Sequence, residues 1–161
     1  MKKFILITIL LISMNSISQE NDLFFDHQAL IVNNLQKSGD FYMDILGLQE
    51  IPVGAGQDPP KRWFKTLNGR EIHLIQSTSI ISELPKSIHM AFSPKNFELF
   101  IDNLKKNQID FSNWEGKLNT IQERVDGQRQ IWIQDPQGYW IEINDIHSKP
   151  YYNNKFIKNY E

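Results

Sequence analysis

The order of predicted elements repeats once along the chain, and this repeat limits the possible folds more than any other feature. A strand-like apolar run at 25–32 precedes a helical pattern at 35–46, and three further strand-like segments follow. After a polar link at 77–86 the same order returns. The predicted strands are 25–32, 48–53, 62–67, 70–76, 88–92, 109–114, 130–134 and 139–143. Two tandem βαβββ units in an α+β fold, forming a curved mixed sheet, are the simplest structure with this order.

Cap and turn residues set the expected boundaries of the first unit. Asn34 precedes the first helix as an N-cap, and Gly47 is placed to end it in the left-handed conformation. Asn68-Gly69 is a strong signal for a tight hairpin between two of the strands.

In the second unit we expect Ser93 to cap a helix with Pro94 at its first position and Asn107 at its end. Its apolar face repeats at helical spacing, and Asp135-Pro136-Gln137-Gly138 predicts a turn between the last two strands. The apolar face comprises Phe97, Phe100, Ile101 and Leu104.

The first 18 residues resemble a secretory signal peptide. Lys2 and Lys3 precede an apolar run at 4–12, and small residues stand at 16 and 18. The alternative is a retained anchor, but this run covers only about half of the ~20 residues that span a bilayer. We therefore expect a periplasmic or secreted protein with no stable membrane insertion after cleavage. The division is a signal peptide at 1–18, one domain at 19–146 with units at 25–77 and 87–146, and a polar tail at 147–161.

Composition excludes several classes of function. The chain has 161 residues, which fits one domain, and it contains no cysteine, so disulfides, thiolate metal sites and cysteine nucleophiles are absent. A net charge of −2 provides no basic surface for nucleic acid. Histidine, present four times, is the only nitrogen ligand of the type that metals favour.

Four residues within predicted strands are candidate metal ligands. His27 and His73 lie in the first and last strands of unit one, and His89 and Glu142 lie in the corresponding strands of unit two. Side chains alternate along a strand, so the apolar neighbours of His73 and Glu142 pack beneath the helices while these two face the other side. Burial of Glu142 is costly unless it is paired or binds a metal. The alternative is a solvated sheet face, which needs four coincidences at equivalent places.

Three segments resemble the vicinal oxygen chelate superfamily, which includes glyoxalase I, fosfomycin-resistance enzymes, methylmalonyl-CoA epimerase and extradiol dioxygenases. They are DHQALIV at 26–32, SGDFY at 38–42 with ILGL at 45–48, and DPQGYWIE at 135–142. The resemblance extends from residue 25 to about 146. It implies a glyoxalase-like metal cup, built within one chain or between two chains of a homodimer.

By this resemblance, His27, His89 and Glu142 match the two-histidine, one-glutamate ligand set of the dioxygenases and fosfomycin-resistance members. His73 stands where glyoxalase I has a further glutamate, which argues against glyoxalase chemistry. The implied cofactor is a divalent metal: zinc, nickel, iron(II), cobalt or manganese. The expected substrate is a small molecule that chelates the metal through neighbouring oxygens. Glu142 is the expected catalytic base if it can leave the metal; otherwise hydroxide would have to serve.

Further side chains are candidates for the substrate pocket: Arg62, Trp63, Arg129 and Trp132. An arginine there could bind a carboxylate or phosphate in bidentate fashion. The alternative is that the arginines solubilise edge strands and the tryptophans pack.

Three functions fit the sequence. The first is an exported metal-dependent lyase or isomerase. The second is a metal-free binding protein of the bleomycin-resistance type, which would need no polar ligands. The third is an extradiol-type dioxygenase, which requires iron(II) or manganese.

Overall fold

The computed structural model describes residues 23–149 except 57 and 80–82, so the predicted signal peptide and all but the start of the polar tail lie outside the described residues. In this part of the chain, no helix is long and apolar enough to cross a bilayer. The elements, in chain order, are β1 (His27–Val32), α1 (Leu35–Asp40), η1 (Phe41–Ile45), β2 (Gln49–Ile51), β3 (Lys61–Lys65), β4 (Glu71–Gln76), β5 (His89–Phe92), α2 (Phe97–Lys106), β6 (Gln122–Glu123), β7 (Arg129–Gln134), β8 (Trp140–Asn144) and η2 (Ile146–Ser148).

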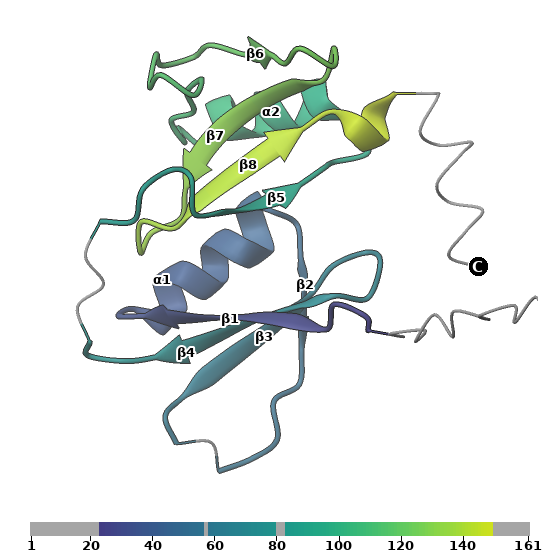
Figure 1. The fold of residues 1–161 in the computed structure, drawn as a ribbon. Coiled ribbons are helices and arrows are strands. Elements are labelled where there is room, and N and C mark those ends of the chain that lie inside the picture. Colours follow the sequence, from purple (N-terminus) through teal and green to yellow (C-terminus); the bar gives the residue numbers. More distant parts are fainter. Residues whose placement is uncertain (1–22, 57, 80–82, 150–161) are drawn as a thin grey trace, which may run out of the picture.

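The two predicted βαβββ units are confirmed, and each forms its own four-stranded mixed sheet. The strand orders are β1-β4-β3-β2 and β5-β8-β7-β6. In each sheet the first and last strands of the unit pair in parallel and the other neighbours pair antiparallel. Figure 1 shows the two sheets with α1 between them. The topology of the second unit therefore repeats that of the first.

The first helical segment changes its winding partway along. Asn34 caps α1 by accepting from the backbone N of Lys37, as predicted. From Phe41 to Ile45 the chain forms a π-helix, and Gly47 follows with φ of 70°. The predicted helix at 35–46 is thus an α turn followed by a π turn. The Asn68-Gly69 hairpin between β3 and β4 is also confirmed.

The start of the second helix differs from the prediction. Asn96, not Ser93, caps α2, and its side chain accepts from the backbone N of Leu99 at 3.0 Å. Ser93 instead donates to the carbonyl of Asn144 and accepts from the backbone N of His147. Because the Ser93 hydroxyl is engaged in these hydrogen bonds, it does not cap the helix. Asn107 ends the helix as expected.

The predicted strand at 109–114 is wrong in extent. Only Ser112 pairs there, through isolated bridges to Leu118 and Trp132. The outer strand of this sheet is β6, two residues long and paired with Gln130 and Arg129. A strand this short carries no apolar alternation, so its sequence gave no periodic signal.

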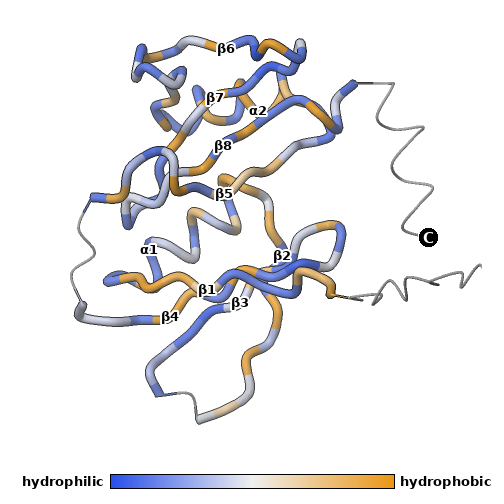
Figure 2. The backbone as a smooth tube through the Cα atoms, viewed as in Figure 1, coloured by the Kyte–Doolittle hydropathy of each residue, from blue (hydrophilic) through white to orange (hydrophobic). Residues whose placement is uncertain are grey.

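The helix-facing residues of both sheets join one apolar core. Figure 2 shows hydrophobic and hydrophilic residues alternating along strands such as β8. The buried set includes Leu30, Val32, Phe64, Ile72 and Leu74 from sheet one, Ile131, Ile133, Ile141 and Ile143 from sheet two, and Phe41, Tyr42, Phe97, Ile101 and Leu104 from the helical segments. The two units therefore share a single core through their inner faces.

The turn after β7 fixes one unit to the other. The hydroxyl of Tyr42 donates to Asp135 Oδ2 at 3.1 Å in the core, and the hydroxyl of Tyr139 contacts the backbone of Ile31. Burial raises the pKa of Asp135, although hydrogen bonds from Tyr139 and Tyr42 oppose the shift. These contacts hold the predicted 135–138 turn beside β1.

Arg62 lies on the helix-covered face of sheet one, in an ion-pair cluster with Asp40 and Glu50. Its Nε and Nη2 donate to the two oxygens of Glu50 at 2.8 and 2.7 Å, and Nη1 donates to Asp40 at 3.1 Å. Hydrogen bonds from Arg62 lower the pKa of both carboxyl groups. The buried Gly39 leaves room for this guanidinium, since a Cβ there would stand 2.0 Å from Arg62 Nη1.

We predict that Gly39→Ala destabilises the domain although alanine favours helix. The gain in helix propensity is up to about 1 kcal/mol, while displacement of the partly exposed ion pairs costs about 2 kcal/mol, so the expected net loss is about 1 kcal/mol. Urea denaturation of both proteins measures the difference. In an Arg62→Ala background the clash is gone, so the same change should become neutral or stabilising. An equal loss in both backgrounds would contradict this assignment.

Candidate functional site

The predicted orientation of His73 and Glu142 is confirmed. In β4 the residues on either side of His73, Ile72 and Leu74, are buried in the shared core. In β8 Glu142 lies between the buried Ile141 and Ile143 in the same way. Strand alternation therefore turns both polar side chains to the sheet face opposite the helices, which we call the outer face.

Strand register places equivalent residues at the same level of the two outer faces. On sheet one, His73 stands between Ala29 and Trp63. On sheet two, Glu142 stands between Ala91 and Trp132. His27 and His89 each precede their alanine by two residues and share its face. The repeat thus extends to the site itself, through a shared His-x-Ala motif that the sequence reasoning missed.

Three rings stack on the outer face of sheet one. His73 lies between His27 and Trp63, with both centroid separations at 4.2 Å and interplanar angles of 15° and 12°. Each histidine also contacts a carboxylate: His27 Nδ1 is 2.7 Å from Asp26 Oδ2, and His73 Nε2 is 2.8 Å from Glu71 Oε2. The hydrogen bond from His27 lowers the pKa of Asp26.

The stack has a consequence for metal binding. An imidazole binds a metal through a lone pair in its ring plane, at about 2.1 Å from nitrogen. Two rings 4.2 Å apart with an interplanar angle of 15° hold their lone pairs in separate, nearly parallel planes, and one ion cannot lie in both planes at bonding distance. In this arrangement His27 and His73 cannot both bind the same metal with good geometry. Because Glu71 occupies Nε2 of His73, His27 is the better ligand of the two.

On sheet two, His89 and Glu142 face one another. His89 Nε2 is 3.7 Å from Glu142 Oε2, and its Nδ1 is 3.0 Å from the carbonyl of Lys86. Asn144 Nδ2 donates to Glu142 Oε1 at 2.9 Å. Two ligand atoms on one tetrahedral zinc are about 3.4 Å apart, given bonds of roughly 2.1 Å. The separation of this pair is close to that value, so the two residues fit a shared metal.

The four predicted ligands do not meet within one chain. His27 contacts His73, and His89 contacts Glu142, but the described residues contain no cluster of three or more His, Asp or Glu side chains that could hold a metal. His147, in η2, is exposed, as expected for a surface residue. The candidate ligands are therefore divided between the two sheets.

Lys86 organises the aromatic part of the sheet-two outer face. Its ammonium donates to the carbonyls of Asn113 and Trp114, each at 3.0 Å, and lies 4.4 Å from the ring centre of Trp140. Burial lowers the pKa of Lys86. The residue thereby holds the 112–114 segment beside Trp132. No signal in the sequence singled it out, because it lies in the polar link.

The predicted pocket tryptophans lie on the outer faces and the predicted pocket arginines do not. Trp63 stacks on His73, and Trp132 meets His89 edge to face at 4.6 Å. Their indole N–H groups are buried and have no hydrogen-bond partner in the described structure. Both tryptophans therefore flank the candidate ligands.

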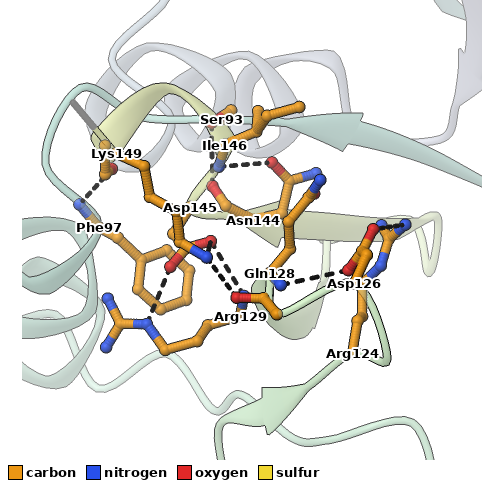
Figure 3. Close-up of polar contacts among 12 residues, drawn as sticks. Ser93, Phe97, Arg124, Asp126, Gln128, Arg129, Asn144, Asp145, Ile146 and Lys149 are labelled. Carbon is orange, nitrogen blue, oxygen red and sulfur yellow. Dashed lines mark hydrogen bonds and ion pairs between the residues drawn. The ribbon is translucent and has the colours of Figure 1, made fainter. Parts of the chain in front are cut away.

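Arg62 and Arg129 bind carboxylates on the helix side instead. Arg129 donates from Nε to Asp145 at 2.9 Å, and its guanidinium lies over the ring of Phe97 (Figure 3). Its Nη1 donates to Glu98 at 2.6 Å. Arg62 is one residue from Trp63, so strand alternation sends it to the opposite face. The arginine that does reach the outer face is Arg124, whose Nη1 is 3.7 Å from Glu142 Oε1.

We predict that Lys86→Met releases the 112–114 segment. Loss of the hydrogen bonds to the carbonyls should cost about 1 kcal/mol and expose the indole of Trp114 further, which shifts tryptophan emission to longer wavelength. Fluorescence spectra and urea denaturation measure the two effects. Lys117→Met is the control, because Lys117 is an exposed lysine in the same loop between α2 and β6, and it should leave the emission unchanged. Identical spectra for Lys86→Met and the parent protein would refute this role.

Comparison with known proteins agrees with this architecture. The family model of the Glyoxalase/Bleomycin resistance protein/Dioxygenase superfamily matches residues 24–143. A glyoxalase family protein from Bacillus anthracis is 22% identical, with a TM-score of 0.63 over 76% of this chain and 94% of its own. The oxidase ChaP-H2 is 21% identical, with a TM-score of 0.65 over 77% and 94%. The fosfomycin resistance protein FosX from Listeria monocytogenes is 20% identical, with a TM-score of 0.60 over 76% and 93%. At these identities the similarity establishes the fold.

Proposed function

The chain belongs to the Glyoxalase/Bleomycin resistance protein/Dioxygenase superfamily, and from this premise we propose that it is a metal-dependent lyase or isomerase. Its substrate would be a small molecule that chelates a divalent metal through neighbouring oxygens. The superfamily also includes fosfomycin-resistance proteins and oxidases among the structural neighbours, so the family alone does not select the reaction. Export, which residues 1–18 predict, is part of this proposal.

The observation that carries the proposal is the state of two histidine rings. His27 Nδ1 contacts the carboxylate of Asp26, and His89 Nδ1 contacts the carbonyl of Lys86. Both partners accept hydrogen bonds, so each Nδ1 carries the proton and each Nε2 keeps its lone pair in the neutral ring. Metal-binding histidines in proteins are oriented in this way by a carboxylate or a backbone carbonyl.

We propose that a complete site forms between two copies of the chain. His27 of one copy would join His89 and Glu142 of a second copy, a two-histidine, one-carboxylate set that suits zinc, nickel or iron(II). The edges of the sheets support this arrangement, because β1 and β5 are both edge strands and the contacts of β1 with Tyr139 and Gln137 are at its end near residues 31–33, away from His27. Exposed Ile31 and Ile88 lie in and next to these strands. A twofold homodimer would cover both edges and build two identical sites.

The chain's own residues would hold and shape such a site. A bound divalent cation would supply Lewis-acid polarisation of the two substrate oxygens. Asn144 donates to Glu142 Oε1, so Oε2, which faces His89, would be the ligand atom, and the second lone pair of Oε1 would accept a substrate proton. Trp63 and Trp132 would form apolar walls that exclude water. His73, paired with Glu71, would line the pocket rather than bind the ion.

Metal content of protein purified without a histidine tag tests the proposal. The parent protein should hold about one divalent ion per chain, and His27→Ala and Glu142→Ala should each lose it. His147→Ala, at an exposed histidine, is the matched control and should retain it. Zinc or nickel would support a lyase or isomerase, and iron would support a dioxygenase. Protein that takes up no metal would refute the proposal in favour of a binding protein.

Mixing the two metal-free variants tests whether the site is shared. In a heterodimer of the His27→Ala and Glu142→Ala chains, one site regains all three ligands and the other keeps only His89. Random pairing makes half of the dimers mixed, so metal per chain should return to about a quarter of the parent value. Co-refolding followed by elemental analysis measures this. A site built within one chain predicts no recovery.

A further inference from the structure

Arg124 reaches the outer face of sheet two from the sheet edge. It begins the tight turn that joins β6 to β7, in which its backbone N donates to the carbonyl of Gln128 at 2.7 Å and its carbonyl accepts from the N of Gly127 at 2.8 Å. From there the side chain extends to Glu142, with 3.7 Å between Nη1 and Oε1. A charged side chain from a surface turn is thus held next to a buried candidate ligand.

Asp126 holds this guanidinium in place. Its Oδ2 accepts from Arg124 Nη2 at 2.9 Å, and its Oδ1 accepts from the backbone N of Gln128 (Figure 3). The same carboxylate therefore fixes both the turn and the side chain. The guanidinium is positioned before any ligand binds, which lowers the entropic cost of using it.

The bonding of Arg124 differs from that of Arg62 and Arg129. Those two arginines each make close hydrogen bonds to two carboxylates on the helix side. Arg124 makes one such bond, to Asp126, and its 3.7 Å approach to Glu142 is longer than a hydrogen bond. In the described structure Nε and Nη1 donate to no acceptor, and two-fifths of the side chain is exposed. Donors therefore remain for a ligand that enters from solvent.

We propose that Arg124 is a specificity residue that binds an oxyanion of the substrate, a carboxylate or a phosphonate, beside Glu142. This inference rests on the proposed function, because it assigns the substrate class of the same site. A substrate bound to a metal held by His89 and Glu142 would lie next to Arg124 Nη1, which is 3.7 Å from Glu142 Oε1. A planar guanidinium matches the two oxygens of a carboxylate or phosphonate. The donor set adds to the preference, since two neutral imidazoles and one carboxylate leave a divalent ion with formal charge +1. The substrate class is therefore an acidic chelator rather than a neutral diol or dione.

The test uses two ligands that differ by one carboxylate. Propionohydroxamate and succinic acid monohydroxamate share a chelating group with neighbouring oxygens, and only the second carries an anion. Isothermal titration calorimetry of zinc-loaded protein gives the ratio of their dissociation constants. We expect the parent protein to prefer the anionic ligand by about tenfold, the usual effect of one charge-assisted hydrogen bond.

Arg124→Gln should abolish this preference, so that the two dissociation constants become about equal. The dissociation constant for propionohydroxamate should stay within about twofold of the parent value. Lys117→Gln removes an exposed positive charge from the loop between α2 and β6 and should keep the preference. This control separates the effect of a specific contact with Arg124 from the effect of net charge. A parent protein with no preference, or a preference that survives in Arg124→Gln, would overturn the assignment.

The design distinguishes this inference from the proposed function. If the protein takes up no zinc, the proposed function fails, and the same titrations are made without metal. An Arg124-dependent preference in that case supports the anion site alone, within a binding protein. Equal or absent binding of both ligands there would overturn the anion site as well.

Discussion

The alternation of apolar and polar residues along β4 and β8 is the constraint on which the rest of this structure depends. Ile72, Leu74, Ile141 and Ile143 are buried in one core beneath the helices. Their burial fixes the register, because a shift of one residue would move each of them to the outer face. His73 and Glu142 are therefore held on the opposite face by the packing of their neighbours. The position of the polar groups follows from the core.

The same alternation places the residues that stabilise the fold on the inner faces of the sheets and the candidate functional residues on the outer faces. Both units contribute to a single core through their inner faces, so the outer faces are free to carry rings and charges that would be costly inside. Tyr42 and Asp135 are an exception within the core. Asp135 Oδ1 accepts from the backbone N of Gln137 and of Tyr139, and the Tyr42 hydroxyl donates to Oδ2, which fixes one unit to the other. The candidate ligands are divided between the two sheets because each sheet turns these side chains away from its own helix.

Periodic features could be predicted from the sequence, and individual side-chain partners could not. Alternation correctly placed His73 and Glu142, and applied to Arg62 it would have placed that residue on the helix side. Serine is a good cap, so the local pattern favours Ser93 for α2, but here its hydroxyl bonds the end of β8, a contact between residues 51 positions apart. The segment between α2 and β7 is long and has little periodicity. The pairing at 109–114 and the contacts of Lys86 and Arg124 all depend on how this segment packs. Such contacts are set by tertiary packing, which a local pattern does not contain.

The two units share a scaffold and differ in chemistry at one equivalent position. His27-x-Ala29 and His89-x-Ala91 repeat, as do Trp63 and Trp132, but His73 faces Glu71 where Glu142 faces Asn144 and Arg124. The imidazole of His73 is held by a carboxylate and stacked on both sides, so its bonding capacity is largely used. Glu142 accepts one hydrogen bond on Oε1 and has only longer approaches from Arg124 and His89. A buried carboxylate that keeps an oxygen open next to a histidine lone pair is suited to bind a cation. The repeat therefore places a carboxylate with an open oxygen beside a histidine in unit two and leaves His27 as the less engaged candidate ligand of unit one.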